Sequence, residues 1–255
     1  MSRIANAFKD KAFVAFLTGG DPDIAATEEF VMQIVKAGAD VIEIGIPFSD
    51  PIAEGPVIQS ASVRALAAGT TLEGLFQLVS RLRQKTEIPL LFMGYLNPIF
   101  NYGYEAFFKR CATVGVDGII IADLPFEESA EVRQYASVSG VDLISMVAPT
   151  SDSARIKQIA TDATGFVYVV SSKGVTGVRS GFSDNLNELL AEVKASTNVP
   201  AAVGFGIHTP EQAAAMAKQA DGVIVGSAIV KIIEKYGREA GEKLYEYVKE
   251  MKQAL

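Results

Sequence analysis

The segment Ala37-Gly38-Ala39-Asp40-Val41-Ile42-Glu43-Ile44-Gly45 decides how this chain folds. Gly38 stands where a helix would end, because glycine readily adopts the left-handed conformation that closes a helix. The run that follows is apolar on both sides except at Glu43, as in a strand buried on both faces of a parallel sheet. The segment therefore predicts a helix that passes directly into a buried parallel strand.

The same transition recurs along the chain. The sequences VGVD (114–117), SGVD (139–142) and QADG (219–222) resemble AGAD (37–40), and in three of the four the glycine falls at the helix end, which capping alone explains. Short apolar runs rich in Val, Ile and Phe predict eight strands, at Phe13–Leu17, Val41–Gly45, Leu90–Tyr95, Gly118–Asp123, Asp142–Ala148, Phe166–Ser171, Ala201–Gly206 and Val223–Gly226. Helical spacing lies between them, for example at Ala25–Lys36, Leu72–Lys85, Tyr104–Val114 and Glu127–Ser137.

Eight strands that alternate with helices predict a parallel sheet with crossover connections. The chain has 255 residues, close to the roughly 250 that a barrel of this kind needs, and no linker or charge run divides it. We predict an α/β fold, a single (β/α)8 TIM barrel over residues 1–255 with extra helices at the N-terminal and C-terminal ends. A doubly wound open sheet is the alternative.

Composition narrows the classes of partner. The formal net charge is −7, which disfavours nucleic acid and anionic membranes. The start of the sequence lacks the apolar run of a signal peptide and no stretch is long enough to span a membrane, so we expect a cytoplasmic protein. The only cysteine, Cys111, is expected to pack inertly, and the only histidine, His208, to lie at the surface or cap a helix. We expect no metal site.

Three loops after consecutive predicted strands are rich in glycine. They are Ser171–Gly181, Gly204-Phe205-Gly206, and Gly226-Ser227, the last of which opens a helix. Barrels often bind phosphate with the loops after strands seven and eight and a helix N-terminus, where free amides face the anion. We predict a phosphate site there, with residues 172–184 as an active-site lid; an ordinary surface loop is the alternative.

Carboxylates mark the opposite side of the predicted barrel mouth. Glu43 in its apolar strand either faces the barrel interior as an acid–base group or forms a salt bridge, and its position alone favours neither. The loop that follows contains three prolines, Asp50 and Glu54. Asp50 can form an Asx-turn before Pro51, and Glu54 is either solvated or a second catalytic carboxylate.

Further motifs accompany these residues in order along nearly the whole chain. They are FLTGGDP (16–22), PFSDP (47–51) followed by Ala53, Glu54, Gly55 and Pro56, YLNP (95–98), ADLP (122–125), SSKGVTG (171–177), GFG (204–206) and GSAIV (226–230). Together they resemble the tryptophan synthase α subunit family. This resemblance implies retro-aldol cleavage of indole-3-glycerol phosphate to indole and glyceraldehyde 3-phosphate. It implies that Glu43 is the acid–base group and that Glu54 stabilises charge on the indole N–H.

The resemblance also implies roles for other residues. The phosphate would be bound by Gly177, Phe205, Gly206, Gly226 and Ser227. The indole pocket would be lined by Phe16, Tyr95, Ala122, Val147, Tyr168 and Thr176, although plain core packing also suits Tyr168. Asp50, Pro51 and Asp123 would face a β subunit in an allosteric α2β2 heterotetramer, through which indole is channelled. This chain would hold no cofactor, and pyridoxal phosphate would belong to the β subunit.

Two departures and three rival functions stand beside that resemblance. Glu54 replaces the Asp that is commoner in the family, and Ser172 replaces an Arg that many relatives carry in the lid. Lys173 near the end of strand six could serve a Schiff-base aldolase. A barrel that only activates a β partner and a stand-alone lyase are the other two alternatives.

Overall fold

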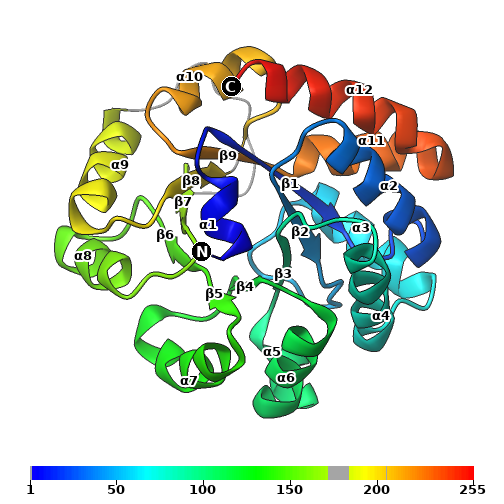
Figure 1. Ribbon diagram of the computed structural model, residues 1–255, viewed down its shortest axis with the longest axis horizontal. Coiled ribbons are helices and arrows are strands. Elements are labelled where there is room, and N and C mark those ends of the chain that lie inside the picture. The colour runs from blue at the N-terminus through cyan, green and yellow to red at the C-terminus, as the bar shows by residue number, and fades with distance from the viewer. Residues whose placement is uncertain (1, 172–183, 205) are drawn as a thin grey trace.

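The computed structural model describes residues 2–171, 184–204 and 206–255 of this chain. Within them, one parallel sheet forms the centre of the fold, with the strand order β5-β4-β3-β2-β1-β9-β8-β7-β6. The strands are β1 (Ala12–Thr18), β2 (Val41–Gly45), β3 (Leu90–Gly94), β4 (Gly118–Ile121), β5 (Asp142–Leu143), β6 (Ser145–Val147), β7 (Val167–Val170), β8 (Ala201–Gly204) and β9 (Gly222–Val225). Figure 1 shows them at the centre of a ring of helices.

The sheet closes on itself through an interrupted strand. β5 pairs with β4 and β6 pairs with β7, and only Ile144 separates β5 from β6. The amide of Ile144 donates to the Ile119 carbonyl at 2.9 Å, so the segment continues the ladder across the break. The predicted (β/α)8 TIM barrel is therefore confirmed over the described residues, and the open sheet is wrong. The predicted fifth strand is two short pieces.

Helices surround the barrel, and additional helices lie near the N-terminus and the C-terminus of the chain. Their bounds are α1 (Arg3–Ala7), α2 (Ile24–Lys36), α3 (Pro56–Ala67), α4 (Leu72–Arg83), α5 (Leu96–Tyr102), α6 (Tyr104–Val114), α7 (Ser129–Ser139), α8 (Ser153–Thr161), α9 (Asp184–Ser196), α10 (Pro210–Ala217), α11 (Ser227–Tyr236) and α12 (Ala240–Gln253), with short 3-10 helices η1 (Phe126–Glu128) and η2 (Gly237–Glu239). α1 and α12 are the predicted extra helices. Helix α5 was not predicted, because its Asn97-Pro98 resembles a loop.

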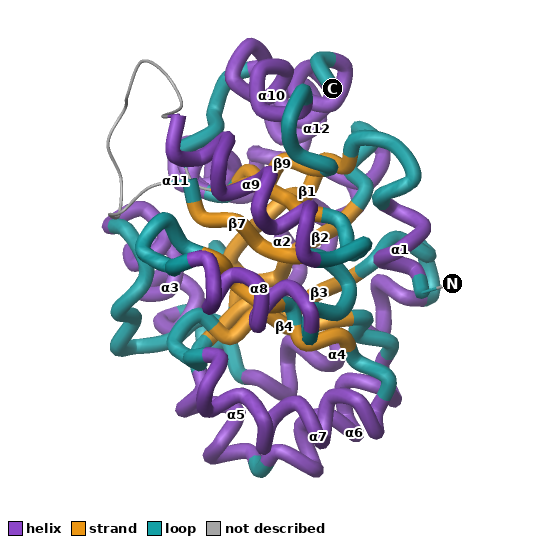
Figure 2. Tube along the Cα trace, turned by 90° about the vertical axis from the view of Figure 1, so that its left-hand side faces the viewer, coloured by secondary structure: helices purple, strands orange, loops and turns teal. Residues whose placement is uncertain are grey.

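The side chains of the strands alternate between two cores. One face packs against the helices, and the other fills the barrel with Val14, Val41, Leu91, Ile120, Ile144, Phe166, Tyr168, Ala202 and Ile224. Ile4 of α1 is fully buried in this inner cluster. The N-terminal helix thus closes one end of the barrel, and Figure 2 shows the strands enclosed by helices.

The recurring helix-to-strand transition has a second function that the sequence did not reveal. The predicted capping holds, since Gly38 and Gly115 have φ values of 104° and 87°. The aspartate that follows also accepts from an amide in the first two residues of a neighbouring strand: Asp40 from Phe13 at 2.7 Å, Asp117 from Leu90 at 2.9 Å and Asp221 from Ala201 at 3.0 Å. Each aspartate satisfies an amide that would otherwise lack a partner at the start of its strand.

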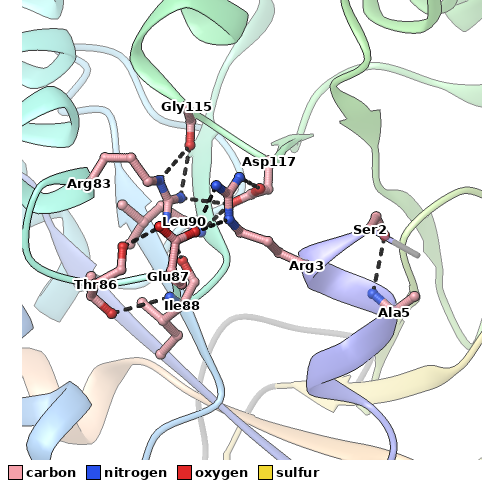
Figure 3. Close-up of polar contacts among 10 residues, drawn as sticks. All are labelled: Ser2, Arg3, Ala5, Arg83, Thr86, Glu87, Ile88, Leu90, Gly115 and Asp117. Carbon is pink, nitrogen blue, oxygen red and sulfur yellow. Dashed lines mark hydrogen bonds and ion pairs between the residues drawn. The ribbon is translucent and has the colours of Figure 1, made fainter.

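Arginines join α1 to the N-terminal end of the barrel (Figure 3). Arg3 in α1 donates to Glu87 at 2.8 Å and to Asp117 at 3.1 Å. Arg83 donates to the other oxygen of Asp117 at 2.7 Å and to the Gly115 carbonyl. This network fixes the end of the barrel opposite the strand C-termini, where active sites of this fold lie.

Three other expectations concern single residues or segments. Cys111 is fully buried, and burial raises the pKa of its thiol, in agreement with inert packing. His208 is exposed, and its backbone amide donates to Gln212 within the capping box that begins α10. Among the described residues, no helix is both long and apolar enough to cross a membrane.

Candidate active site

Glu43 is the only acidic residue that any described strand buries completely on the inner face of the barrel. It follows Val41 on that face of β2, and it pairs in register with Phe16 of β1 and Leu91 of β3. Within the described part of the chain, neither carboxylate oxygen has a hydrogen-bond partner and no cation forms an ion pair with it. Burial therefore raises the pKa of Glu43 from 4.5 to about 8. Of the two expectations for Glu43, the geometry favours the acid–base group over the salt bridge.

Tyr168 shares the inner face with Glu43. It lies on β7, is 4% exposed, and packs in the inner cluster, as the core-packing alternative expects, and its place in the indole pocket stays a prediction. Burial and the nearby Glu43 charge raise the pKa of its phenol well above 10. A Cβ at Gly204 would lie 2.3 Å from the Tyr168 hydroxyl, so only glycine leaves room for this side chain.

Phe16 covers the strand ends next to Glu43. Its ring lies against two glycines, since a Cβ at Gly45 or Gly226 would come within 2.7 Å or 3.1 Å of ring carbons. Ile58 and Val230 pack with it from α3 and α11. The phenyl ring therefore stands between the candidate acid–base strand and the start of α11, where the resemblance places a flat aromatic substrate.

Glu54 lies in the loop between β2 and α3. It is partly buried, and its Oε2 is buried without a hydrogen-bond partner among the described residues. Burial raises the pKa of this carboxyl from 4.5 to about 7. A purely solvated carboxylate does not describe these surroundings, so Glu54 qualifies as a second candidate catalytic group.

Tyr95 connects this loop to the strand ends. Its hydroxyl accepts from the Ala53 amide at 3.0 Å, and its ring centre lies 5.3 Å from that of Phe48. Burial raises the pKa of Tyr95 to about 12, and the charges of Glu54 and Asp123 act in the same direction. Tyr95 thus lies near enough to both carboxylates to sense their charge, and it holds the residue next to Glu54.

One predicted pocket residue faces the wrong way. Val147 is fully buried in the cluster between strands and helices, whereas Met146 lies on the inner face and pairs in register with Tyr168. We correct the expectation from Val147 to Met146.

Met93 and Ile120 also lie on this inner face and were not predicted from the sequence. Strict alternation from Tyr168 across the β6–β7 register would have found Met146. Ala122 is partly exposed just beyond β4, and its place in the pocket lining stays a prediction.

The structure describes three of the five predicted phosphate-binding residues. Gly226 is the N-cap of α11, and Ser227, its first residue, is partly exposed. Gly206 is exposed, and its φ of 82° suits glycine. β8 and β9 pair as neighbours, so these positions follow adjacent strands and can present amides to one anion. Gly177, Thr176, Phe205, and the lid with Ser172 and Lys173, lie outside the described residues.

The predicted partner-facing residues surround the same mouth of the barrel. Asp50 is exposed and accepts a hydrogen bond from the Ser49 hydroxyl, and Pro51 is partly buried. Asp123 accepts from the Leu96 amide at 2.8 Å and so orients the start of α5. Two exposed apolar side chains accompany them, Ile52 at 79% and Phe100 at 65%. Neither Ile52 nor Phe100 was predicted from the sequence.

These features define a class. A TIM barrel with a buried, unpaired carboxylate on an inner strand face and a helix N-terminus after its last strand can perform acid–base chemistry on a phosphorylated substrate. No group of three or more His, Cys, Asp or Glu within the described ranges could hold a metal ion.

Comparison with known proteins specifies the family. The sequence profile described as "Tryptophan synthase alpha chain" matches residues 3–255, and the chain belongs to that family. It is 50% identical to the tryptophan synthase alpha chain of Geobacter sp. (strain M21), with 100% of this chain and 98% of that protein aligned.

Solved structures agree with this assignment. The tryptophan synthase alpha chain from Legionella pneumophila subsp. pneumophila superposes with a TM-score of 0.89 at 38% identity, covering 100% of this chain and 97% of that chain. A chain from the tryptophan synthase α2β2 complex of Pyrococcus furiosus gives a TM-score of 0.88 at 38% identity, covering 96% of this chain and 99% of that one.

Proposed function

We propose that this chain cleaves indole-3-glycerol phosphate to indole and glyceraldehyde 3-phosphate, the α reaction of tryptophan biosynthesis. It acts as one barrel domain in the cytoplasm. The observation that carries the proposal is the buried and unpaired carboxylate of Glu43 on the inner face of β2. A carboxyl with a pKa near 8 is largely protonated at neutral pH and can donate a proton, which an ordinary glutamate cannot do.

Glu43 serves two proton transfers in sequence. It first protonates indole C3, which converts the ring to an indoleninium ion and weakens the bond from C3 to the glycerol chain. The Glu43 carboxylate formed in this step then accepts the proton of the adjacent glycerol hydroxyl. That hydroxyl becomes the aldehyde of glyceraldehyde 3-phosphate as the C–C bond breaks, and the bonding electrons return to the ring to give indole. Glu43 ends the cycle protonated, as it began.

Glu54 supports this chemistry as an anion. The indoleninium N–H carries developing positive charge, and a fixed carboxylate beside it stabilises that charge most in the transition state. Glutamate is one methylene longer than the commoner aspartate. The backbone around it is fixed on both sides, because the Ala53 amide donates to Tyr95 and the Gln59 side chain donates to the Glu54 carbonyl at 2.8 Å.

The substrate is held at both ends. The phosphate is bound by Gly177, Phe205, Gly206, Gly226 and Ser227. The indole is contacted by Phe16, Tyr95, Ala122, Met146, Tyr168 and Thr176. Asp50, Pro51 and Asp123 face a tryptophan synthase β subunit in an α2β2 assembly. That subunit holds pyridoxal phosphate, whereas the α reaction uses only acid–base groups of this chain.

Indole formation from indole-3-glycerol phosphate tests this proposal, with the purified chain alone and with a tryptophan synthase β subunit. We expect weak activity alone and a strong rise with the partner. Strong activity alone would favour a stand-alone lyase. No indole in either condition would refute Glu43 and Glu54 as a working pair and leave a barrel that only activates its partner. Borohydride trapping of Lys173 with an aldehyde substrate would instead identify a Schiff-base aldolase.

A further inference from the structure

One guanidinium joins three elements at the mouth of the barrel. Arg64, in the last turn of α3, donates from Nε and Nη2 to the two carboxylate oxygens of Asp21, both at 2.8 Å. Its third nitrogen, Nη1, lies 3.2 Å from Oε1 of Glu234 in α11. α3 and α11 lie side by side on one flank of the barrel (Figure 2).

The pair with Asp21 is the stronger of these two contacts. Asp21, in the loop after β1, is 1% exposed, whereas the Glu234 side chain is 48% exposed. A bidentate arginine–carboxylate pair fixes both distance and angle, which a lysine at the same position cannot do. The exposed contact to Glu234 contributes little. Arg64 therefore chiefly attaches α3 to the loop after β1.

The other end of α3 leads directly to Glu54. Gly55 is the N-cap of the helix and Pro56 its first residue. Ile58 and Ala61 of α3 pack against Phe16, so the helix also touches the candidate substrate pocket. On the far side of Glu54, the loop is held by the hydrogen bond from Ala53 to Tyr95. Glu54 is thus held between two anchors, Tyr95 before it and α3 after it.

From this arrangement we propose that Arg64 is a positioning residue for the reaction: its bidentate pair with Asp21 fixes α3 and thereby sets the place of the Glu54 carboxylate. The inference rests on the proposed function. It adds a residue that contacts no reacting atom and acts through Glu54. A misplacement of about 1 Å in a catalytic group can lower the rate on the order of 10²-fold, so a modest shift of α3 has a measurable effect.

Arg64→Lys, Glu54→Gln and the double variant test the inference in the complex with a β subunit. Arg64→Lys keeps the positive charge and removes the bidentate pairing with Asp21. We expect kcat to fall about 10- to 100-fold with little change in KM. In the Glu54→Gln background the same change should lower kcat less than about 2-fold, because the group that Arg64 positions is already disabled.

Arg81→Lys is the matched control. Arg81 lies on α4, pairs with Glu28 at 2.6 Å, and belongs to a helix that carries no candidate site residue. We expect it to leave kcat unchanged. Equal effects of Arg64→Lys and Arg81→Lys, or a full Arg64→Lys effect in the Glu54→Gln background, would overturn the inference while the active wild type still supported the proposed function. An inactive wild type would refute the proposed function and the positioning role together.

Discussion

Nη2 of Arg83 lies 2.7 Å from Oδ2 of Asp117 at the N-terminal end of the barrel, where the two side chains are only 12% and 10% exposed. The same carboxylate oxygen accepts from the Leu90 amide at the start of β3, and Arg83 also donates to the Ile88 carbonyl. This end of the barrel contains no candidate catalytic residue. The pair should therefore contribute to stability, whereas the carboxylates at the other end serve the reaction.

Asp117→Asn should destabilise the protein without altering the site. The change leaves the nearly buried guanidinium of Arg83 without its countercharge, which typically costs about 3 kcal/mol. Urea unfolding measures the loss. Glu87→Gln is the control, since Glu87 is 79% exposed in its pair with Arg3 and should contribute at most about 0.5 kcal/mol. Equal losses in the two variants would show that burial does not decide the strength of this network.

Glu43→Gln should stabilise the protein, and increasingly so as the pH rises. The pKa of Glu43 is raised from 4.5 to about 8 by burial, so its carboxyl favours folding when protonated. The stability that the protonated Glu43 contributes is fully present below its pKa in the unfolded protein. It is lost as the pH rises through its pKa in the folded protein. Glutamine has no such charge to bury. Between about pH 5 and about pH 8.5 the advantage of the variant in unfolding free energy should grow on the order of 3 kcal/mol.

Denaturant unfolding across that range measures this difference. Glu188→Gln, at an exposed position on α9, is the control and should show no comparable trend. A Gln variant whose advantage stays constant with pH would mean that Glu43 is ionised in the folded protein. It would then not be the proton donor that the reaction needs.

The rate should depend on pH through both carboxylates. The reaction needs Glu43 protonated, which is lost as the pH rises past about 8, and Glu54 ionised, which is lost as the pH falls below about 7. We expect a bell-shaped profile of kcat/KM with its maximum between these values. Glu54→Gln should remove the fall in kcat/KM on the acidic side near pH 7. A fall near about pH 6 would remain, because the substrate phosphate becomes protonated there. A profile that Glu54→Gln leaves unchanged would exclude Glu54 from the titration.

Local pattern was enough to predict the barrel and to single out Glu43, whereas its acid–base role came from the resemblance. The buried parallel strands are nearly continuous apolar runs, and the single charge in one of them, Glu43, stood out for that reason. Val147 entered the predicted pocket through the resemblance alone, whereas the alternation that puts Ile144 and Met146 on the inner face places Val147 against the helices. Contacts between residues that are distant in the sequence could not be predicted either. Arg64 and Asp21 are separated by 43 positions, and neither has a local motif that indicates the other.

The length of the side chain at position 54 gives the last prediction. If the loop is adapted to glutamate, Glu54→Asp withdraws the carboxylate by about one methylene and should lower kcat about 10- to 100-fold. Glu54→Gln retains the length and removes the charge that stabilises the indole N–H, and should lower kcat on the order of 10²- to 10³-fold. Indole formation in the presence of the β subunit measures both, with the Arg81→Lys variant as a control for general damage. An Asp variant faster than the wild type would show that the loop is adapted to the shorter acid, and a fully active Gln variant would remove Glu54 from the mechanism.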